Sequence, residues 1–392
     1  MKHVAIIIQK LNGGGAERTA SNLSMFLKDL CNVHLIVFDG REITYPYAGV
    51  FHDLKLPALE GKANKVLNFY KRVAAVKKLK KENNIDYSIS LMDGANLVNA
   101  LSCVGDKVIT SVRIQMSKSR NVKQGLGSVI SRKTMQFIGK KSYKVVALSK
   151  GVEEDLLNVY GVPQEKLVTI YNPCDYEVLL QNAEKNNIQL ESGNAIVTMG
   201  RLTEQKGQWH LIRAISEVKK TIPDIKLYIL GEGPLKERLD KLVVDMDLQK
   251  HVKLLGYIKA PHACFKFCDA FVFPSEFEGL GNVLLEAMAF GLPCISSDCY
   301  SGPREILAPG TTVKEHLDNI ELAEYGILTS VCGKGEFNSN DPLTKEEKQL
   351  AEAIVSLLTD KALMDHYHRM SLNRREAFTP VKITNDWMAL LK

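Results

Sequence analysis

Short runs of hydrophobic residues alternate along the chain with longer stretches that mix hydrophobic and polar residues at helical spacing. Consecutive apolar positions are typical of parallel β-strands that helices cover on both faces. The runs that predict strands are HVAIIIQ (3–9), VHLIVFD (33–39), DYSISLM (86–92), KVITSVR (107–113), KVVALS (144–149), KLVTIYN (166–172), AIVTMG (195–200), KLYILG (226–231), HVKLLG (251–256), AFVFPS (270–275), PCISS (293–297) and YGILTS (325–330).

Amphipathic stretches between these runs, such as EDLLNVYG (154–161) and PLKERLDKLVVD (234–245), complete β-α-β units. Each half of the chain therefore predicts a doubly wound, Rossmann-like α/β sheet. The length of 392 residues is sufficient for two domains. Ligands of such sheets bind beyond the carboxyl ends of the strands.

The boundary between the halves is expected at NPCD (172–175), where Pro173 interrupts regular structure. Residues 1–174 carry 26 Lys and Arg against 14 Asp and Glu, and residues 175–392 carry 25 against 31. We therefore expect an N-terminal domain over 1–174 and a C-terminal domain over 175–375. The amphipathic segment 376–392 is free to pack back on the first domain. Residues 308–324 and 332–345 resemble polar loops.

Composition narrows the class of protein. No apolar run reaches the roughly 20 residues that span a bilayer, and the N-terminus lacks a signal-peptide cleavage pattern. The eight cysteines form no CxxC pair and show no metal-ligand spacing. These features favour a cytoplasmic enzyme with reduced, mostly buried thiols and without a metal site.

A glycine turn, LNGGGAER (11–18), follows the first strand and opens a helix. Gly13, Gly14 and Gly15 allow a ligand to approach the backbone closely. The free N–H groups of the helix behind them suit a phosphate. A turn of this kind between a strand and a helix is also common without a ligand, and GxGxxG is absent.

Two cations follow the first strand of the second half, in GRLTEQKGQ (200–208). Arg201 and Lys206 are suited to a diphosphate, one as a planar fork and the other as a point charge. The alternative is two solvated loop charges.

Two glutamates lie eight residues apart in SEFEGLGNVLLEAMAFGLP (275–293). The run NVLLEAMAF predicts a buried helix with Asn282 as its N-cap, Glu286 in its first turns and Glu278 in the loop before it. A carboxylate binds a vicinal diol well because each hydroxyl donates one hydrogen. The alternatives are a structural ion pair for Glu286 and a solvated loop acid for Glu278.

With these motifs in order, the chain resembles the retaining glycosyltransferases of family 4. The Glu-x7-Glu motif, EGLGNVLLE (278–286), is the most specific element of the resemblance, which covers essentially the whole chain. It is supported by GGGAER, VVALSKGVEEDLLNVYGV, IYNP, GRLTEQKG, LYILGEGPLKERL and GPREIL. The resemblance implies the B-type fold, in which two Rossmann-like domains face each other across a cleft.

The resemblance also implies roles for individual residues in binding a nucleotide sugar. Glu286 binds the ribose hydroxyls and Glu278 contacts the donor sugar. Arg201 and Lys206 hold the diphosphate, and we expect them to act with Glu278 in catalysis. The remaining donor-binding residues are expected to be Gly14 and Gly15 at the phosphates, Gly281 and Asn282 where the helix opens, and the backbone of Tyr257 and Ile258 at the base.

One position departs from the family pattern. Many members carry a histidine after the fourth strand of the first domain, near the donor sugar. Here VITSVRIQ places Arg113 there. An arginine binds a hydroxyl or a phosphate but does not act as a base near neutral pH. Arg113 is therefore expected to contact the donor, and a histidine-based role is not carried over.

The paired cations replace a metal in this interpretation, so we expect transfer that needs neither metal nor cofactor. The resemblance implies retention of the donor's configuration. UDP is the favoured nucleotide, and GDP-mannose is the alternative donor. The rival functions are an NAD(P)-dependent oxidoreductase, which the absence of GxGxxG disfavours, and a non-catalytic sugar or lipid adaptor, which the complete motif set disfavours.

Two basic segments of the first half lack acidic residues. Residues 61–81 hold eight Lys and Arg, and residues 107–150 hold eleven. A solvated helix face explains a single run of this kind. Two runs favour an anionic membrane surface, with nucleic acid disfavoured because no aromatic-interleaved motif is present. We therefore expect a lipid-linked or oligosaccharide acceptor, with the enzyme peripheral on the inner face of the cell membrane.

Overall fold

The structure, a computed structural model, describes residues 1–119, 126–186, 188–311, 317–333 and 337–392. It divides into two compact units. Unit 1 comprises Met1–Asn172 and Pro380–Lys392, and unit 2 comprises Pro173–Thr379. The division after Asn172 lies two residues before the expected boundary, and only the part of segment 376–392 from Pro380 onward belongs to unit 1. Residues 312–316 and 334–336 of the two expected polar loops lie outside the described residues.

Unit 1 is built on a seven-stranded parallel sheet in the order β3-β2-β1-β4-β5-β6-β7. Six strands confirm the sequence predictions. The seventh, β3, lies at the edge, where its side chains are half-buried or exposed, so it carries no apolar run. The strands are β1 (His3–Ile8), β2 (Asn32–Val37), β3 (Val50–Asp53), β4 (Tyr87–Leu91), β5 (Lys107–Val112), β6 (Lys144–Ala147) and β7 (Leu167–Thr169).

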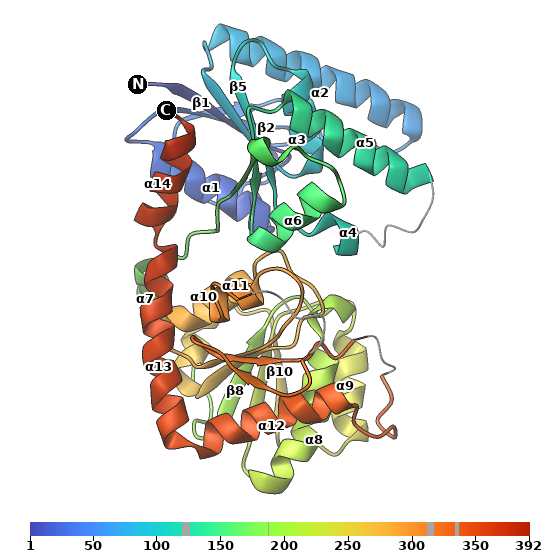
Figure 1. Ribbon diagram of the computed structural model, residues 1–392, viewed down its shortest axis with the longest axis vertical. Helices are drawn as coiled ribbons and strands as arrows, with labels where there is room; N and C mark the ends of the chain where they lie inside the picture. Colours follow the sequence, from blue (N-terminus) through green and yellow to red (C-terminus); the bar gives the residue numbers. More distant parts are fainter. Residues whose placement is uncertain (120–125, 187, 312–316, 334–336) are drawn as a thin grey trace. The chain divides into compact units, whose positions relative to one another are not determined.

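Helices cover the sheet of unit 1, and one of them comes from the C-terminal part of the chain. Ile383, Trp387 and Leu391, four residues apart, are buried in the same core as β1, β2 and β4. The helix that carries the first two, α14, lies beside α1 (Figure 1). The helices are α1 (Gly15–Leu27), α2 (Lys62–Glu82), α3 (Asp93–Leu101), α4 (Met116–Ser119), α5 (Leu126–Lys141), α6 (Lys150–Asn158), the 3-10 turn η1 (Gln164–Lys166) and α14 (Pro380–Leu390).

Unit 2 repeats this architecture with strand order β10-β9-β8-β11-β12-β14-β13. All neighbours are parallel except β13, which pairs antiparallel with β14. The six predicted strands of this half are confirmed, and the two-residue β13 is additional. The strands are β8 (Ala195–Met199), β9 (Lys226–Leu230), β10 (Val252–Gly256), β11 (Ala270–Phe273), β12 (Cys294–Ser297), β13 (Glu321–Leu322) and β14 (Ile327–Thr329).

The helical elements of unit 2 place its candidate site residues. They are α7 (Tyr176–Glu184), η2 (Glu204–Lys206), α8 (Gln208–Thr221), α9 (Lys236–Asp245), η3 (Pro261–Phe267), α10 (Asn282–Ala289), α11 (Pro303–Leu307), α12 (Lys345–Thr359), α13 (Lys361–Arg375) and η4 (Glu376–Phe378). The strand order reverses between the adjacent strands β8 and β11, so the loops that follow these strands meet at one edge.

The remaining expectations on composition have clear outcomes. Six of the eight cysteines are buried, Cys332 is half-buried and Cys103 is exposed, and all eight are free thiols. Among the described helices, none combines the length and the apolar character that a membrane span needs. The fold class is confirmed as two doubly wound α/β units.

Candidate active site

Lys206 and Glu278 are in direct contact at the carboxyl ends of β8 and β11. Lys206 ends η2, the turn after β8, and Glu278 lies in the loop after β11. Lys206 Nζ donates to Glu278 Oε1 over 2.5 Å, and their side chains are only 19% and 10% exposed. A carboxylate so little exposed needs a donor. The structure therefore gives Glu278 an internal partner, and the solvated-acid alternative does not hold.

The two loops that carry this pair are tied together through the backbone. Glu276 N donates to Gln205 O, and Gln205 Nε2 donates to Phe277 O, both over 2.8 Å. Gly207 has φ +61°, and a Cβ at this position would lie 2.2 Å from Pro274 O. Only glycine fits this close approach without a shift of the backbone. The glycine after Lys206 thus fixes the distance between the loops.

An aromatic ring and a thiol line the same place. Lys206 Nζ lies 5.2 Å from the centre of the Phe273 ring, within the range of a cation–π contact. Burial, together with the negative charge of Glu278, raises the pKa of the Cys299 thiol well above its usual value. This thiol is therefore protonated at neutral pH and is not a nucleophile.

Glu286, the second acid of the motif, is buried in α10. All of the residues from Leu284 to Ala289 are buried, as the apolar pattern predicts. Glu286 Oε2 lies 2.9 Å from His262 Nε2, and both side chains are 11% exposed. The sequence analysis did not single out His262, because one histidine in η3 has no spacing signal that links it to a helix 24 residues later. His262 is thus one partner of Glu286, whereas the sequence analysis offered a Lys or Arg as the alternative.

The expected N-cap of α10 is wrong by one residue. Gly281 is the N-cap, with φ +88° and no side chain to cap the helix, and Asn282 is the first residue of the helix. The left-handed backbone at this position favours glycine over asparagine. The N-terminus of α10, the positive end of the helix dipole, consequently lies next to the loop that carries Glu278.

The remaining predicted residues of unit 2 lie at the surface. Arg201, two residues after the end of β8, is exposed and its side chain has no partner in the described part of the chain. Tyr257 follows the edge strand β10 and is 75% exposed. Ile258, beside it, is half-buried. The contacts of the structure join none of these three to the Lys206–Glu278 pair.

Unit 1 brings the glycine turn and Arg113 to one helix. Gly14 is the N-cap of α1 and Gly15 its first residue. Arg113, after β5, donates to Thr19 Oγ1 of α1 over 3.2 Å and also to Asn172 Oδ1, and Thr19 Oγ1 lies 2.9 Å from Gly15 O. A third acceptor, Ser111 Oγ, lies 3.3 Å from Nη1.

Arg113 is a cation among uncharged partners. Burial lowers its pKa to about 9, so the guanidinium still carries its charge at neutral pH. None of its three acceptors is a carboxylate. Such a charge is available to an anionic or hydroxyl-bearing ligand at this edge of the sheet.

Two family models together cover most of the chain. Residues 13–178 match the model "Glycosyltransferase Family 4", and residues 180–328 match "Glycosyl transferases group 1". An uncharacterized glycosyltransferase of Methanocaldococcus jannaschii is 32% identical over 82% of this chain and 83% of its own length. The chain belongs to glycosyltransferase family 4. The family resemblance in the sequence is thereby confirmed.

This family 4 glycosyltransferase also has a full-length relative with a specific name. The N-acetylgalactosamine-N,N'-diacetylbacillosaminyl-diphospho-undecaprenol 4-alpha-N-acetylgalactosaminyltransferase of Campylobacter jejuni is 28% identical over 100% of both chains. The crystal structure of HepE from Anabaena in complex with UDP and glucose matches with a TM-score of 0.75 and 18% identity, over 100% of this chain and 99% of that one. The match with the HepE structure establishes the B-type glycosyltransferase fold for both units.

Proposed function

We propose that the glycosyltransferase transfers a sugar from a nucleotide sugar, with retention of configuration, to a lipid-linked or oligosaccharide acceptor in envelope-glycan synthesis. The observation that carries this proposal is the contact of Lys206 with Glu278 where β8 and β11 end, next to the N-terminus of α10. This edge holds a cation, an acid and the positive end of a helix dipole together, a set of groups that suits a sugar diphosphate.

The nucleoside diphosphate that leaves in the reaction gives the cationic side chains of this site their proposed role. When the bond to the sugar breaks, negative charge develops on the diphosphate, and fixed donors that face this charge supply a large part of catalysis. Lys206 is positioned by its loop, and Arg201 is exposed and unpaired in the described part of the chain, so both are available to the diphosphate. In unit 1 the proposed phosphate contacts are the backbone of Gly14 and Gly15, with Arg113 contacting the donor.

Glu278 has a different task, because positive charge develops at the anomeric carbon. We propose that its carboxylate positions the sugar and favours this charge, while Glu286 accepts hydrogen bonds from the ribose hydroxyls. Tyr257 and Ile258 present backbone to the base. These assignments follow the family motif at each position, and the burial of both acids supports them.

Metal independence belongs to the same proposal. Lys206 and Arg201 supply positive charge at the place where other enzymes use a divalent cation. In the described residues, no group of three or more His, Cys, Asp or Glu is arranged to hold a metal ion. We expect full activity in excess chelator, and strict loss of activity that magnesium or manganese restores would contradict the proposal.

The favoured donor is a UDP-sugar. This choice draws on the Anabaena structure, which is a complex with UDP and glucose, and on the relatives named for galactosyl and N-acetylgalactosaminyl transfer. GDP-mannose is the alternative. A thermal-shift screen against UDP- and GDP-sugars tests both, because a bound donor raises the melting temperature by mass action. A chain that no nucleotide sugar stabilises, and that releases no nucleoside diphosphate with acceptors, does not have this function.

The acceptor proposal draws on relatives that are named for diphospho-undecaprenol glycans. Such a glycan carries a diphosphate on a hydrocarbon chain at the membrane surface. A protein that binds it requires basic and apolar residues side by side. Unit 1 presents such a combination on its helices α2 and α5.

The exposed face of α2 is narrower than the sequence suggests. Phe69, Val73, Val76 and Leu79 pack toward the core of unit 1, and Lys80 is fully buried. Lys80 Nζ bonds Asp106 Oδ2 over 2.9 Å, although burial lowers the pKa of this lysine. These five residues therefore do not face a membrane.

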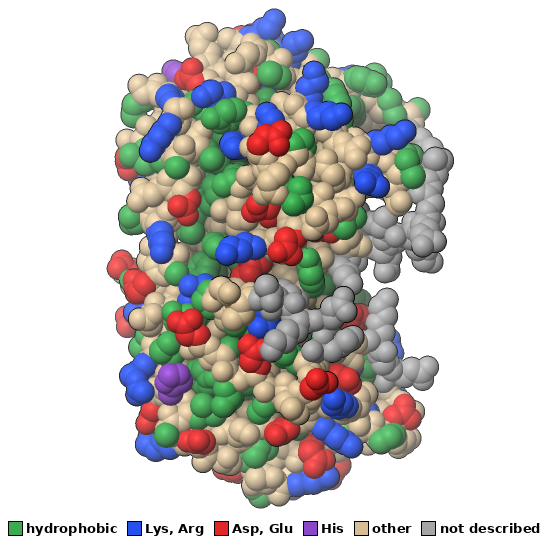
Figure 2. Space-filling view, in the orientation of Figure 1, with side chains coloured by type: hydrophobic (Ala, Val, Ile, Leu, Met, Phe, Trp, Pro, Cys, Tyr) green, Lys and Arg blue, Asp and Glu red, His purple; other side chains and the backbone are tan. Residues whose placement is uncertain are grey.

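The side chains that remain at the surface mix charge with hydrophobic area. On α2, Val66, Leu67 and Tyr70 are each more than half exposed, and Lys65, Lys71, Lys77 and Lys78 are exposed with them. Figure 2 shows Lys and Arg side chains interleaved with hydrophobic ones on this part of unit 1. Basic residues of the second segment, Arg120 and Lys123, lie outside the described residues.

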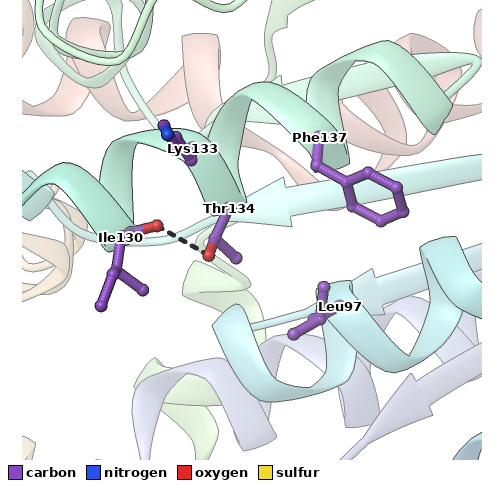
Figure 3. A pocket seen from close by; sticks show the side chains of 5 residues that line it. All are labelled: Leu97, Ile130, Lys133, Thr134 and Phe137. Atoms are coloured by element: carbon purple, nitrogen blue, oxygen red, sulfur yellow. Dashed lines mark hydrogen bonds between the residues drawn. The ribbon is translucent and has the colours of Figure 1, made fainter.

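A hollow of about 300 Å³ lies between α3 and α5 (Figure 3). Its lining comes from Leu97 of α3 and from Ile130, Lys133, Thr134 and Phe137 of α5. Thr134 Oγ1 donates to Ile130 O over 2.8 Å, so its hydroxyl is satisfied within the helix and its methyl group is left to the hollow. We propose that the hydrocarbon end of the acceptor or of a membrane lipid contacts this hollow, with Lys133 facing the phosphate layer.

Vesicle sedimentation tests the membrane proposal. We expect binding to vesicles that contain anionic lipid at low salt, a decrease at high salt, and little binding to neutral vesicles, since each basic residue contributes about 1 kcal/mol near an anionic surface. Ile130→Ser with Val129→Ser tests the apolar part, with the exposed Val244→Ser of unit 2 as the control. Equal sedimentation with neutral and anionic vesicles at low salt would contradict the proposal.

A further inference from the structure

The contact between His262 and Glu286 joins two parts of unit 2 that are far apart in sequence. His262 lies in η3, before β11, and Glu286 in α10, after it. The 2.9 Å between His262 Nε2 and Glu286 Oε2 is a full hydrogen bond, and both side chains are nearly buried. No other polar contact of the His262 ring is present in the described part of the chain.

Two phenylalanines hold the imidazole in this orientation. The His262 ring is parallel to that of Phe290, with 6.0 Å between centres and 4° between planes. Phe265 meets the imidazole edge-on, at 5.4 Å and 87°. Pro261 begins η3 and fixes the backbone in front of the histidine. The aromatic contacts leave His262 little freedom to rotate, so its nitrogen stays directed at the carboxylate.

The chemistry of the pair assigns the donor. An ionised carboxylate only accepts hydrogen bonds, so the proton of this bond belongs to His262 Nε2. The bond restrains the Glu286 carboxylate and occupies one position on Oε2. A carboxylate offers about four acceptor positions on its two oxygens, so the bond from His262 does not by itself exhaust its capacity to accept hydrogen bonds. A carboxylate held in this way requires no reorganisation when two vicinal hydroxyls arrive.

We propose that His262 is a positioning residue for recognition of the donor ribose, acting through Glu286. The inference rests on the proposed function, because the ribose is the ligand that Glu286 serves there. His262 does not touch the donor. It holds the acceptor oxygens where the 2′- and 3′-hydroxyls meet them, so its removal weakens recognition of these hydroxyls and leaves recognition of the diphosphate unchanged.

The test compares three variants with two ligands. His262→Phe keeps a ring between Phe265 and Phe290 but removes the donor, and His262→Gln places an amide N–H near the position of Nε2. Phe290→Leu is the packing control, since it alters the stacking and keeps the hydrogen bond. Calorimetry measures Kd for UDP and for 2′,3′-dideoxy-UDP, and in parallel for GDP and 2′,3′-dideoxy-GDP. Near-UV circular dichroism checks that each variant is folded.

We expect His262→Phe to raise Kd for the ribonucleotide about tenfold, because Glu286 loses the partner that orients its carboxylate, and to leave Kd for the dideoxy nucleotide within about twofold. In the transfer reaction the donor KM rises by a similar factor while kcat changes less than about threefold. His262→Gln restores most of the loss, and Phe290→Leu keeps the preference for the ribonucleotide.

Two results overturn the inference separately from the proposed function. If the wild-type chain prefers ribonucleotides and His262→Phe keeps that preference, His262 has no positioning role while the function stands. If His262→Phe weakens both nucleotides equally, its role is structural. A wild-type chain that binds neither nucleotide pair, or binds each pair without regard to the hydroxyls, removes the inference together with the ribose role of Glu286.

Discussion

At the residue scale, Glu278 has the most specific proposed role. Its side chain is buried and paired with Lys206, and it is the first acid of the Glu-x7-Glu motif. In Glu278→Gln the amide keeps the size of the side chain and loses the negative charge that favours the developing oxocarbenium ion. We expect kcat to fall about 100-fold while Kd for the nucleoside diphosphate changes less than about threefold. Glu204→Gln, at an exposed position of the η2 loop, is the matched control. Normal turnover in Glu278→Gln refutes the role.

Lys206 and Arg201 have the same proposed role at the diphosphate but different surroundings. Their alanine variants should therefore lose activity to a similar extent and differ in stability. Lys206→Ala leaves the 10%-exposed Glu278 side chain without its lysine, and we expect unit 2 to lose about 1–3 kcal/mol of unfolding free energy. Arg201→Ala removes an exposed side chain with no partner among the described residues, so stability stays within about 0.5 kcal/mol. Both variants are expected to lose activity about 100-fold.

The measurement for this pair is urea unfolding followed by Trp209 fluorescence, because Trp209 is buried in the core of unit 2. The double variant Lys206→Ala with Glu278→Gln is expected to regain part of the lost stability, since no unpaired charge remains. Equal stability of Lys206→Ala and the wild type would show that the contact contributes nothing to the fold.

At the scale of elements, Gly207 sets the distance between the loops after β8 and β11. In Gly207→Ala the new Cβ meets Pro274 O at 2.2 Å and the residue keeps a positive φ of 61°. Gly193 also has a positive φ, +90°, but a Cβ there meets nothing within 4 Å. We expect Gly193→Ala to cost about 1 kcal/mol, from φ alone, and Gly207→Ala to cost clearly more and to lower turnover. Urea midpoints and kcat measure both, and equal costs would show that the close approach is relaxed.

A row of three histidines crosses strands β1, β2 and β3 of unit 1. His34 Nε2 lies 3.1 Å from His3 Nδ1, and His34 Nδ1 lies 3.2 Å from His52 Nε2. Burial, with the neighbouring His52 and His3, lowers the pKa of His34 to about 4, and burial lowers that of His52. Such groups fold in the neutral form. Their contribution is fully present above the unfolded pKa of about 6.5 and is lost as the pH falls toward the folded pKa.

We therefore expect unit 1 to lose about 2 kcal/mol of unfolding free energy from His34 alone between pH 7.5 and pH 5. Trp209→Phe leaves Trp387, in the core of unit 1, as the fluorescent reporter. In this background His34→Gln should flatten the pH dependence over the same range. An equally steep loss of stability in His34→Gln would assign the effect to other groups.

The elements differ in how far the sequence predicts them, and the reason is physical. Parallel strands that helices cover on both faces are apolar at consecutive positions, so the sequence alone predicts twelve of the strands. The edge strand β3 is only half covered and lacks that signal. The motif residues are found because a fixed local spacing accompanies their chemistry. His262 pairs with Glu286 only through tertiary packing, and Lys80 turns inward to Asp106 for the same reason. Local patterns do not encode such contacts.

For the whole molecule, the chain leaves unit 1 at Asn172, forms unit 2 and returns to unit 1 at Pro380. The returning segment completes a core. Trp387 is 3% exposed among residues of β1, β2 and β4, and Lys2 Nζ donates to Leu391 O over 2.5 Å. Unit 1 is thus assembled from both ends of the sequence, whereas unit 2 is continuous. The stability of unit 1 consequently depends on a helix that follows unit 2 along the chain.

Trp387→Ala tests this dependence. Removing a buried tryptophan costs about 3–5 kcal/mol, because both transfer free energy and packing are lost. We expect amide hydrogen exchange to accelerate throughout the sheet of unit 1, while the strands of unit 2 and the Trp209 unfolding transition stay as in the wild type. The matched control is Val381→Ala, on the same helix but 73% exposed, which should leave both units unchanged. If Trp387→Ala instead destabilises both units equally, the two units unfold as one cooperative body. The division after Asn172 would then describe the contacts of the fold but not separate unfolding transitions.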